Sequence, residues 1–184
     1  MGLFLFYNAR IMQLFINDDR GVLISSLFLA LITHTCKAFA HGGSAEELLL
    51  WMISASLFFL VRAIAESRAF SRLESFLTGA FVSFTLLIKF NVLGFYLGVI
   101  LFVLLWYIKN KYYNQLFESI GYFMLGLIGV ILPVLFYFIV NDAVYELWEV
   151  YFYNNIFIYD TPQFSNQVPA NLPPVLMRIG RIGQ

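Results

Sequence analysis

The pattern of hydrophobic and charged positions divides the chain into long uncharged stretches separated by short charged connections. Because about 20 apolar residues cross the roughly 30 Å hydrocarbon core of a bilayer, each stretch is close to the length of a membrane span. We therefore expect an all-α fold, a polytopic transmembrane helix bundle with five clear spans. The predicted spans are residues 21–36, 48–61, 75–88, 90–108 and 119–141.

The bundle is expected to occupy residues 1–140, and a second, extracytoplasmic part to occupy residues 141–184. Residues 1–16 form a further apolar segment that Asn8 and Arg10 interrupt, so we interpret it as a short sixth span or the remnant of one. The second part begins as an aromatic and acidic segment. Its proline-rich continuation, residues 161–174, predicts an extended loop.

Two of the predicted spans are short for a bilayer. Residues 48–61 and 75–88 would each cover only about 21 Å as a helix, at roughly 1.5 Å per residue. Neighbouring cations such as Arg62 and Lys89 can extend to the headgroups while their alkyl stems stay in apolar surroundings. A re-entrant hairpin over residues 75–108 is the alternative interpretation.

Composition supports a membrane protein and excludes several other classes. The chain is 61% hydrophobic and 12% charged, whereas soluble domains are about 45–50% apolar and 25% charged. A soluble cytosolic enzyme is thereby excluded. The net charge of zero argues against a nucleic-acid partner. With Cys36 as the one cysteine, the sequence offers no internal disulfide and no Cys/His zinc site. We predict no metal site, and the sequence identifies no cofactor.

Lysine and arginine predict the orientation. The connections between the spans fall alternately on the two sides of the membrane, and one side carries seven lysines and arginines against two on the other. Cytoplasmic loops typically carry the excess of these cations. The richer set should therefore be cytoplasmic and residues 141–184 should lie outside. The richer set is Arg10, Arg20, Arg62, Arg68, Arg72, Lys109 and Lys111, and the other set is Lys37 and Lys89.

Lys89 is the strongest candidate for binding chemistry. It lies in the sequence Ile88-Lys89-Phe90-Asn91, a tight turn between two spans on the cation-poor side. An ammonium at this position could hold a lipid phosphate as a point charge. The alternative is a lysine that only anchors the end of a helix in the headgroup region.

Acidic pairs give weaker signals. Glu46 and Glu47 follow Ser44, so they can serve as first-turn carboxylates of a capped helix. Adjacent residues on a helix point about 100° apart, which disfavours both reaching one ligand. Asp18 and Asp19 are interpreted as a solvated turn that caps the next helix on the cytoplasmic side.

A GxxxG pattern offers a contact surface for another helix. Gly94 and Gly98 lie four residues apart on an apolar helix, a spacing that lets helix backbones approach closely. Gly126 and Gly129 give a weaker small-residue face on the last span. We expect partner helices to pack through Gly94 and Gly98.

The order of these features resembles a known enzyme class. Glu46-Glu47-Leu48-Leu49 opens a span, Leu86-Leu87-Ile88-Lys89-Phe90-Asn91 ends one, and Pro133 precedes Asn141-Asp142-Ala143. Trp148 and Phe152-Tyr153-Asn154 follow. In this order the chain resembles membrane glycosyltransferases of the C-type fold, and specifically the bacterial branch related to protein O-mannosyltransferases. Such enzymes take a sugar from a polyprenyl-phosphate donor outside the cytoplasmic membrane.

The resemblance implies a substrate-binding set. It would place Lys89 near the phosphate of a polyprenyl-phosphate-linked sugar and Glu46 near the outer cavity. The full predicted set is Lys89, Asn91, Glu46, Glu47, Asn141 and Asp142.

The chain departs from that family at the catalytic acid. Family members carry this acid in the first outer loop, and the present sequence begins around the third or fourth span of the pattern. We therefore assign no catalytic residue and expect an internal fragment or truncated product that is inactive alone. The alternative function is a non-catalytic multispan subunit that packs against a partner protein. A small transporter is disfavoured, because Lys37, Arg62 and Lys89 all lie at span ends.

Overall fold

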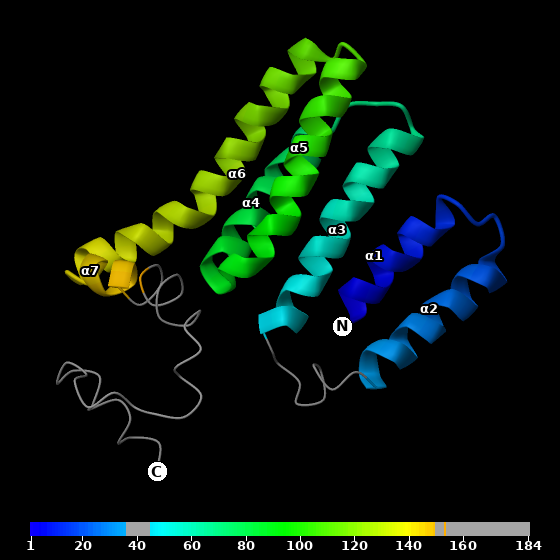
Figure 1. The fold of residues 1–184 in the computed structure, drawn as a ribbon, viewed down its shortest axis with the longest axis horizontal. Helices are drawn as coiled ribbons and strands as arrows, with labels where there is room; N and C mark the ends of the chain where they lie inside the picture. Colours follow the sequence, from blue (N-terminus) through cyan, green and yellow to red (C-terminus); the bar gives the residue numbers. More distant parts are fainter. Residues whose placement is uncertain (36–44, 150–152, 154–184) are drawn as a thin grey trace. The chain divides into compact units, whose positions relative to one another are not determined.

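The computed structural model describes residues 1–35, 45–149 and Tyr153 (Figure 1). It divides into two compact units, residues 1–134 and 135–184, which we describe separately. Within the described residues every regular element is helical and no strand occurs, which confirms the all-α fold class. The elements are α1 (Gly2–Gln13), α2 (Asp19–Thr35), α3 (Ala45–Ala65), α4 (Arg72–Ile88), η2 (Phe90–Val92), α5 (Leu93–Lys109), α6 (Tyr113–Val140) and α7 (Val144–Leu147).

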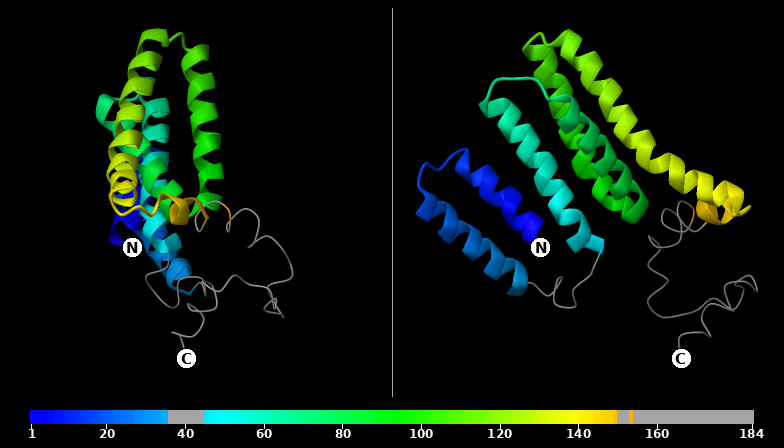
Figure 2. Two further views of the ribbon diagram at one scale, coloured as in Figure 1. Left: turned by 90° about the vertical axis from the view of Figure 1, so that its left-hand side faces the viewer. Right: turned by 180° about the vertical axis from the view of Figure 1, so that it is seen from behind.

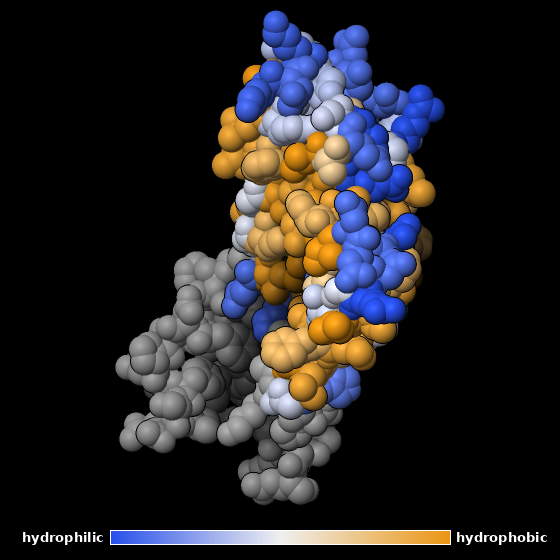
Figure 3. All heavy atoms as spheres, turned by 90° about the vertical axis from the view of Figure 1, so that its right-hand side faces the viewer, coloured by the Kyte–Doolittle hydropathy of each residue, from blue (hydrophilic) through white to orange (hydrophobic). Residues whose placement is uncertain are grey.

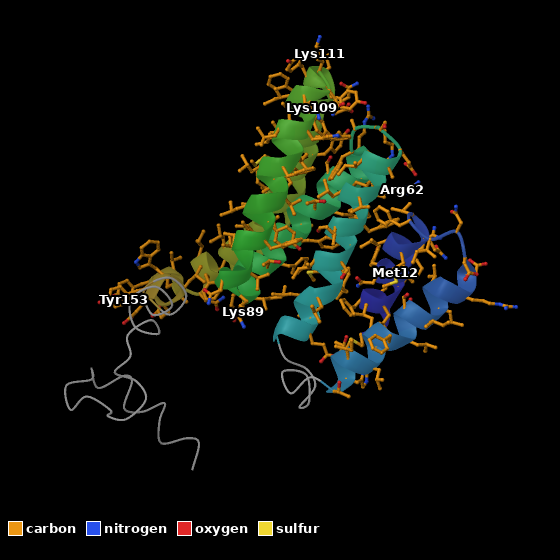
Figure 4. The ribbon with its side chains drawn as sticks, turned by 45° about the vertical axis from the view of Figure 1, so that its right-hand side comes forward. Met12, Arg62, Lys89, Lys109, Lys111 and Tyr153 are labelled. Atoms are coloured by element: carbon orange, nitrogen blue, oxygen red, sulfur yellow. The ribbon has the colours of Figure 1, made fainter. Side chains whose placement is uncertain are left out.

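Successive long helices of the first unit run in alternating directions. Both the front and rear views show α1 between α2 and α3 (Figures 1 and 2). The alternation gathers the connections after α1, α3 and α5 at one end, which we call the basic end because it carries Arg62, Arg68, Arg72, Lys109 and Lys111. Lys89 lies at the other end, which we call the Lys89 end (Figure 4).

The core of the first unit joins α3, α4 and α5. Its fully buried members include Leu49, Ala55 and Tyr96, and Tyr7 of α1 packs against the cluster. Asn8 donates a hydrogen bond to Ser54 Oγ at 3.0 Å and so links α1 to α3. At 12 residues, or about 18 Å, α1 is shorter than the hydrocarbon core of a bilayer.

Two glycines, one on α4 and one on α6, allow the backbones of these helices to approach closely. A Cβ added at Gly79 would overlap the carbonyl oxygen of Phe123, and one added at Gly126 would overlap that of Phe76. By contrast, a Cβ added at Gly94 or Gly98 would meet no described atom within 4 Å. The GxxxG pair therefore makes no helix contact within the described chain.

The expectation of five clear spans exceeds what the helix lengths support. Among the described residues, two helices are long and apolar enough to cross a membrane, Glu47–Ala65 and Tyr113–Val140. The segments expected at 21–36, 75–88 and 90–108 fold as α2, α4 and α5, each of 17 residues. Helices of this length cover about 26 Å, short of the roughly 30 Å hydrocarbon core.

Large apolar side chains cover much of the outside of the first unit. Figure 3 shows hydrophobic residues over much of its visible face, with hydrophilic residues at the upper end and along the right-hand edge. Exposed apolar surface this extensive is typical of helices that contact lipid or other proteins. On α2 and α5 the exposed residues include Leu23, Ile24, Leu27, Phe28, Leu97, Leu101 and Leu105.

Candidate functional site

Lys89 occupies the junction between α4 and α5. Its backbone is extended, with φ −153° and ψ 97°, while its N–H still donates to the carbonyl of Thr85 at 2.8 Å. The helix therefore ends at Lys89, and the short η2 leads the chain into α5. Lys89 is half-buried and Asn91 is exposed. The predicted tight turn between two apolar segments is confirmed.

The first turn of α3 lies at the same end of the unit. Leu49 belongs to the core cluster, and Ile88 and Val92, which flank the α4–α5 junction, pack against the same cluster. Glu47 is half-buried in this first turn. Glu46 lies in α3 by its backbone, and its side chain is outside the described residues. Part of the predicted set, Lys89, Asn91 and the first turn of α3, is thus gathered at one end.

Asn141 and Asp142 belong to the second unit. There Asn141 Nδ2 donates to the carbonyl of Tyr137 at 2.7 Å at the end of α6. Asp142 has φ 52°, a left-handed conformation that aspartate tolerates better than most residues. The prolines of the predicted loop, residues 161–174, lie outside the described residues.

At the basic end, a network of ion pairs orders the connection between α3 and α4. Both terminal nitrogens of Arg68 donate to the Glu74 carboxylate at 2.7 Å, and Arg68 Nε donates to Glu66 at 2.6 Å. Arg62 Nε also donates to Glu66, at 2.8 Å. Glu74 is the buried member, with its side chain 8% exposed.

Hydrogen bonding satisfies the charged groups of this network. Glu74 accepts hydrogen bonds from both terminal nitrogens of Arg68 and from the backbone N–H of Ser71 at 2.8 Å. The hydrogen bond to Glu74 raises the pKa of Arg68. The buried carboxylate of Glu74 is thus fully paired.

Two tyrosine hydroxyls fix the same connection. Tyr107 Oη accepts the backbone N–H of Phe70 at 2.8 Å, and Tyr112 Oη donates to the carbonyl of Ser67 at 2.7 Å. Ser67 has φ 50°, a conformation that such contacts hold in place. The charge pattern of the sequence did not predict this group of ion pairs and tyrosine hydrogen bonds. The Ser71-x-x-Glu74 spacing could have indicated it, because this spacing is typical of a capping box, which the structure forms.

Two cavities open beside this network. The first, of about 280 Å³, lies between α4, α5 and α6 and is lined by Phe70, Ser75, Thr78, Val99, Ile100, Val103, Leu104, Tyr107, Leu116, Ser119, Ile120, Phe123 and Met124. The second, of about 450 Å³, is lined by Phe70, Ser71, Arg72, Leu73, Gln115, Glu118, Ser119 and Tyr122. Phe70 and Ser119 line both, so an apolar cavity and a polar one share a wall.

Comparisons with known protein families, curated proteins and solved structures find no match to this chain. Within the described residues no group of three or more His, Cys, Asp or Glu side chains is placed to hold a metal ion. The functional argument therefore rests on the residues themselves and on their positions in the helical unit.

Proposed function

We propose that this chain is part of an integral membrane glycosyltransferase that moves a sugar from a polyprenyl-phosphate donor to an extracytoplasmic acceptor. By itself the chain is inactive, because the catalytic acid of the enzymes it resembles has no counterpart in it. The membrane is a bacterial cytoplasmic membrane, and the C-terminal segment lies outside.

The proposed enzyme part crosses the membrane five times, through the two candidate spans and three shorter helices. The 17-residue helices α2, α4 and α5 cross the bilayer with the help of residues that flank them. At about 26 Å each, they need only one or two flanking residues at each end, and long cationic side chains supply such extensions. Their exposed apolar faces support contact with lipid tails.

Charge asymmetry along the bundle supports the orientation. The alternating helices collect Arg62, Arg68, Arg72, Lys109 and Lys111 at the basic end. Such an excess of cations is typical of the cytoplasmic side. The Lys89 end then faces outward, the side on which polyprenyl-phosphate sugars are used by the enzymes that this chain resembles.

The observation that carries the donor proposal is the position of Lys89. Its half-buried stem lies where α4 ends, at the opposite end of the unit from the basic cluster (Figure 4). An ammonium at the boundary between hydrocarbon and headgroups suits a lipid phosphate, because a charge-assisted hydrogen bond strengthens where water is partly excluded. The apolar helices beside it suit the polyprenyl tail.

A charge-removal experiment tests this assignment. In detergent, Lys89→Gln should weaken binding of a polyprenyl phosphate by about ten- to hundredfold, the range expected for loss of a hydrogen bond between charged groups. Lys109→Gln removes the same charge at the other end of α5 and should leave binding unchanged. Equal affinities for wild type and both variants would reduce Lys89 to a membrane anchor.

A second candidate function is a non-catalytic subunit that docks through α5. The specific observation in its favour is the open space beside Gly94 and Gly98, flanked by the exposed side chains of Leu97 and Leu101. Replacing both glycines with leucine should leave the stability of the chain unchanged but block a partner helix. Cross-linking in intact membranes from a cysteine at Leu97 tests this candidate, which predicts an adduct that the double leucine variant loses; the absence of any adduct would contradict it.

A further inference from the structure

The two cavities at the basic end form one amphipathic groove. The apolar cavity lies between α4, α5 and α6 and is open on one side, and the polar cavity shares Phe70 and Ser119 with it and reaches the first turns of α4 and α6. This end of the unit is the opposite one from Lys89 (Figure 4). The groove is therefore separate from the proposed donor site.

The wall of the apolar cavity offers almost no polar atom to a ligand. Ser75 lines the cavity, but it is only 3% exposed and its Oγ is buried away from the cavity surface. The neighbouring hydroxyls are used within the protein: Thr78 donates to the carbonyl of Glu74 at 2.7 Å, and Tyr107 pairs with Ser119 at 2.9 Å. The cavity therefore suits a purely apolar group of a ligand.

The polar cavity carries one cation beside one anion. Arg72 Nε donates to Glu118 at 2.6 Å, and the guanidinium also lies 5.7 Å from the ring centre of Tyr122. The arginine and glutamate side chains are 72% and 44% exposed, so both are accessible to a ligand from outside. A site with this pairing favours a headgroup that carries both charges, because a purely anionic headgroup would meet Glu118 unfavourably.

We propose that the groove binds one acyl chain and the headgroup of a phosphoethanolamine glycerophospholipid. The chain occupies the apolar cavity, whose volume of about 280 Å³ suits a tail rather than a whole lipid. The phosphate contacts Arg72, and the ammonium contacts Glu118. This lipid fills the space between α5 and α6, and its binding stabilises the folded unit increasingly as the lipid concentration rises above Kd.

Native mass spectrometry of the purified full chain in detergent measures this binding directly. The probes are phosphatidylethanolamine, phosphatidylglycerol and diacylglycerol with identical acyl chains. We expect one tightly held phosphatidylethanolamine per chain, with about tenfold weaker retention of the other two lipids. Equal retention of all three lipids would overturn the proposal and indicate non-specific lipid.

Matched variants test each part of the groove. Arg72→Gln should weaken phosphatidylethanolamine binding about tenfold, whereas Arg62→Gln, at the same end but outside the groove, should not. Val103→Phe should fill the apolar cavity and abolish retention, whereas Leu101→Phe adds the same ring on α5 outside the cavity. Wild-type binding by Arg72→Gln and Val103→Phe would contradict the proposal.

Arg72→Gln also guards against variants that fail to fold. The Arg72 side chain is 72% exposed and its ion pair with Glu118 lies at the surface, so its loss should leave thermal stability without lipid nearly unchanged. Weaker phosphatidylethanolamine binding by this variant would therefore report the headgroup contact and not a loss of folding. None of these measurements depends on Lys89 or on sugar transfer. A negative result here would therefore leave the proposed function untouched, and failure of the proposed function would leave the lipid groove untouched.

Discussion

The substitution Gly126→Ala probes the backbone contact between α4 and α6. A methyl group at Gly126 would overlap the carbonyl oxygen of Phe76 and lie 2.9 Å from its carbonyl carbon and 3.0 Å from the backbone nitrogen of Ala80. These atoms belong to the backbone of α4, so no side-chain rotation can relieve the overlap. The two helices must move apart for the alanine to fit.

The magnitude follows from two opposing effects. Overpacking of a closely packed site costs typically about 1–3 kcal/mol, and the rigid backbone of α4 places this site towards the upper end. Alanine in a helix is better than glycine by up to about 1 kcal/mol. The overlap outweighs the propensity, and we expect Gly126→Ala to be destabilised by about 1–2 kcal/mol.

Gly129→Ala is the matched control, because it makes the same change one turn later on α6. A Cβ at Gly129 would meet no described atom within 4 Å, so we expect neutral or slightly increased stability. The assay is reversible unfolding of the purified chain in mixed detergent micelles, followed by helical circular dichroism. If Gly126→Ala were as stable as Gly129→Ala, the close approach of α4 and α6 would be refuted.

Two further predictions concern the network at the basic end. Glu74→Gln should lower the free energy of unfolding at neutral pH by about 2 kcal/mol, a value reduced from that of a fully buried pair because Arg68 is 31% exposed. Chemical denaturation of the purified chain at pH 7 measures this difference, and equal stability of wild type and Glu74→Gln would contradict the assigned ion pair. Tyr107→Phe leaves the backbone N–H of Phe70 without its acceptor and should cost about 1–3 kcal/mol, whereas Tyr112→Phe, whose bond is exposed, should cost less than about 1 kcal/mol in the same melts. Equal melts for the two variants would contradict the assigned contacts.

Features that depend on local sequence could be predicted. The charged break at Lys89 marks the turn between two apolar helices, because an ammonium ends an apolar run and the following residues begin a new one. The gathering of cations at one end also follows from the alternation of apolar and charged segments. Span lengths were less predictable, because uncharged residues at the edges of a stretch, such as Ser119 and Asn141, can lie inside or outside a helix.

Features that depend on which helix faces meet could not be predicted. Gly94 and Gly98 have the spacing that favours close packing, yet the glycines used within the unit are Gly79 and Gly126. The sequence predicted a weaker small-residue face at Gly126 and Gly129, and the structure confirms it at Gly126 but not at Gly129. Spacing shows that a face is small but not what lies opposite. The ion pair between Arg68 and Glu74 likewise depends on the path of the connection, which the charge pattern alone does not define.

The central claim is that the helices of the first unit cross a membrane with the basic end inside and Lys89 outside. Single cysteines at Asn91 and Asn110, at opposite ends of α5, test it in a Cys36→Ala background. On intact cells, a membrane-impermeant thiol reagent should label position 91 and spare position 110 until the membrane is permeabilised. Labelling of position 110 alone would invert the orientation, and labelling of both positions on intact cells would contradict the crossing of α5.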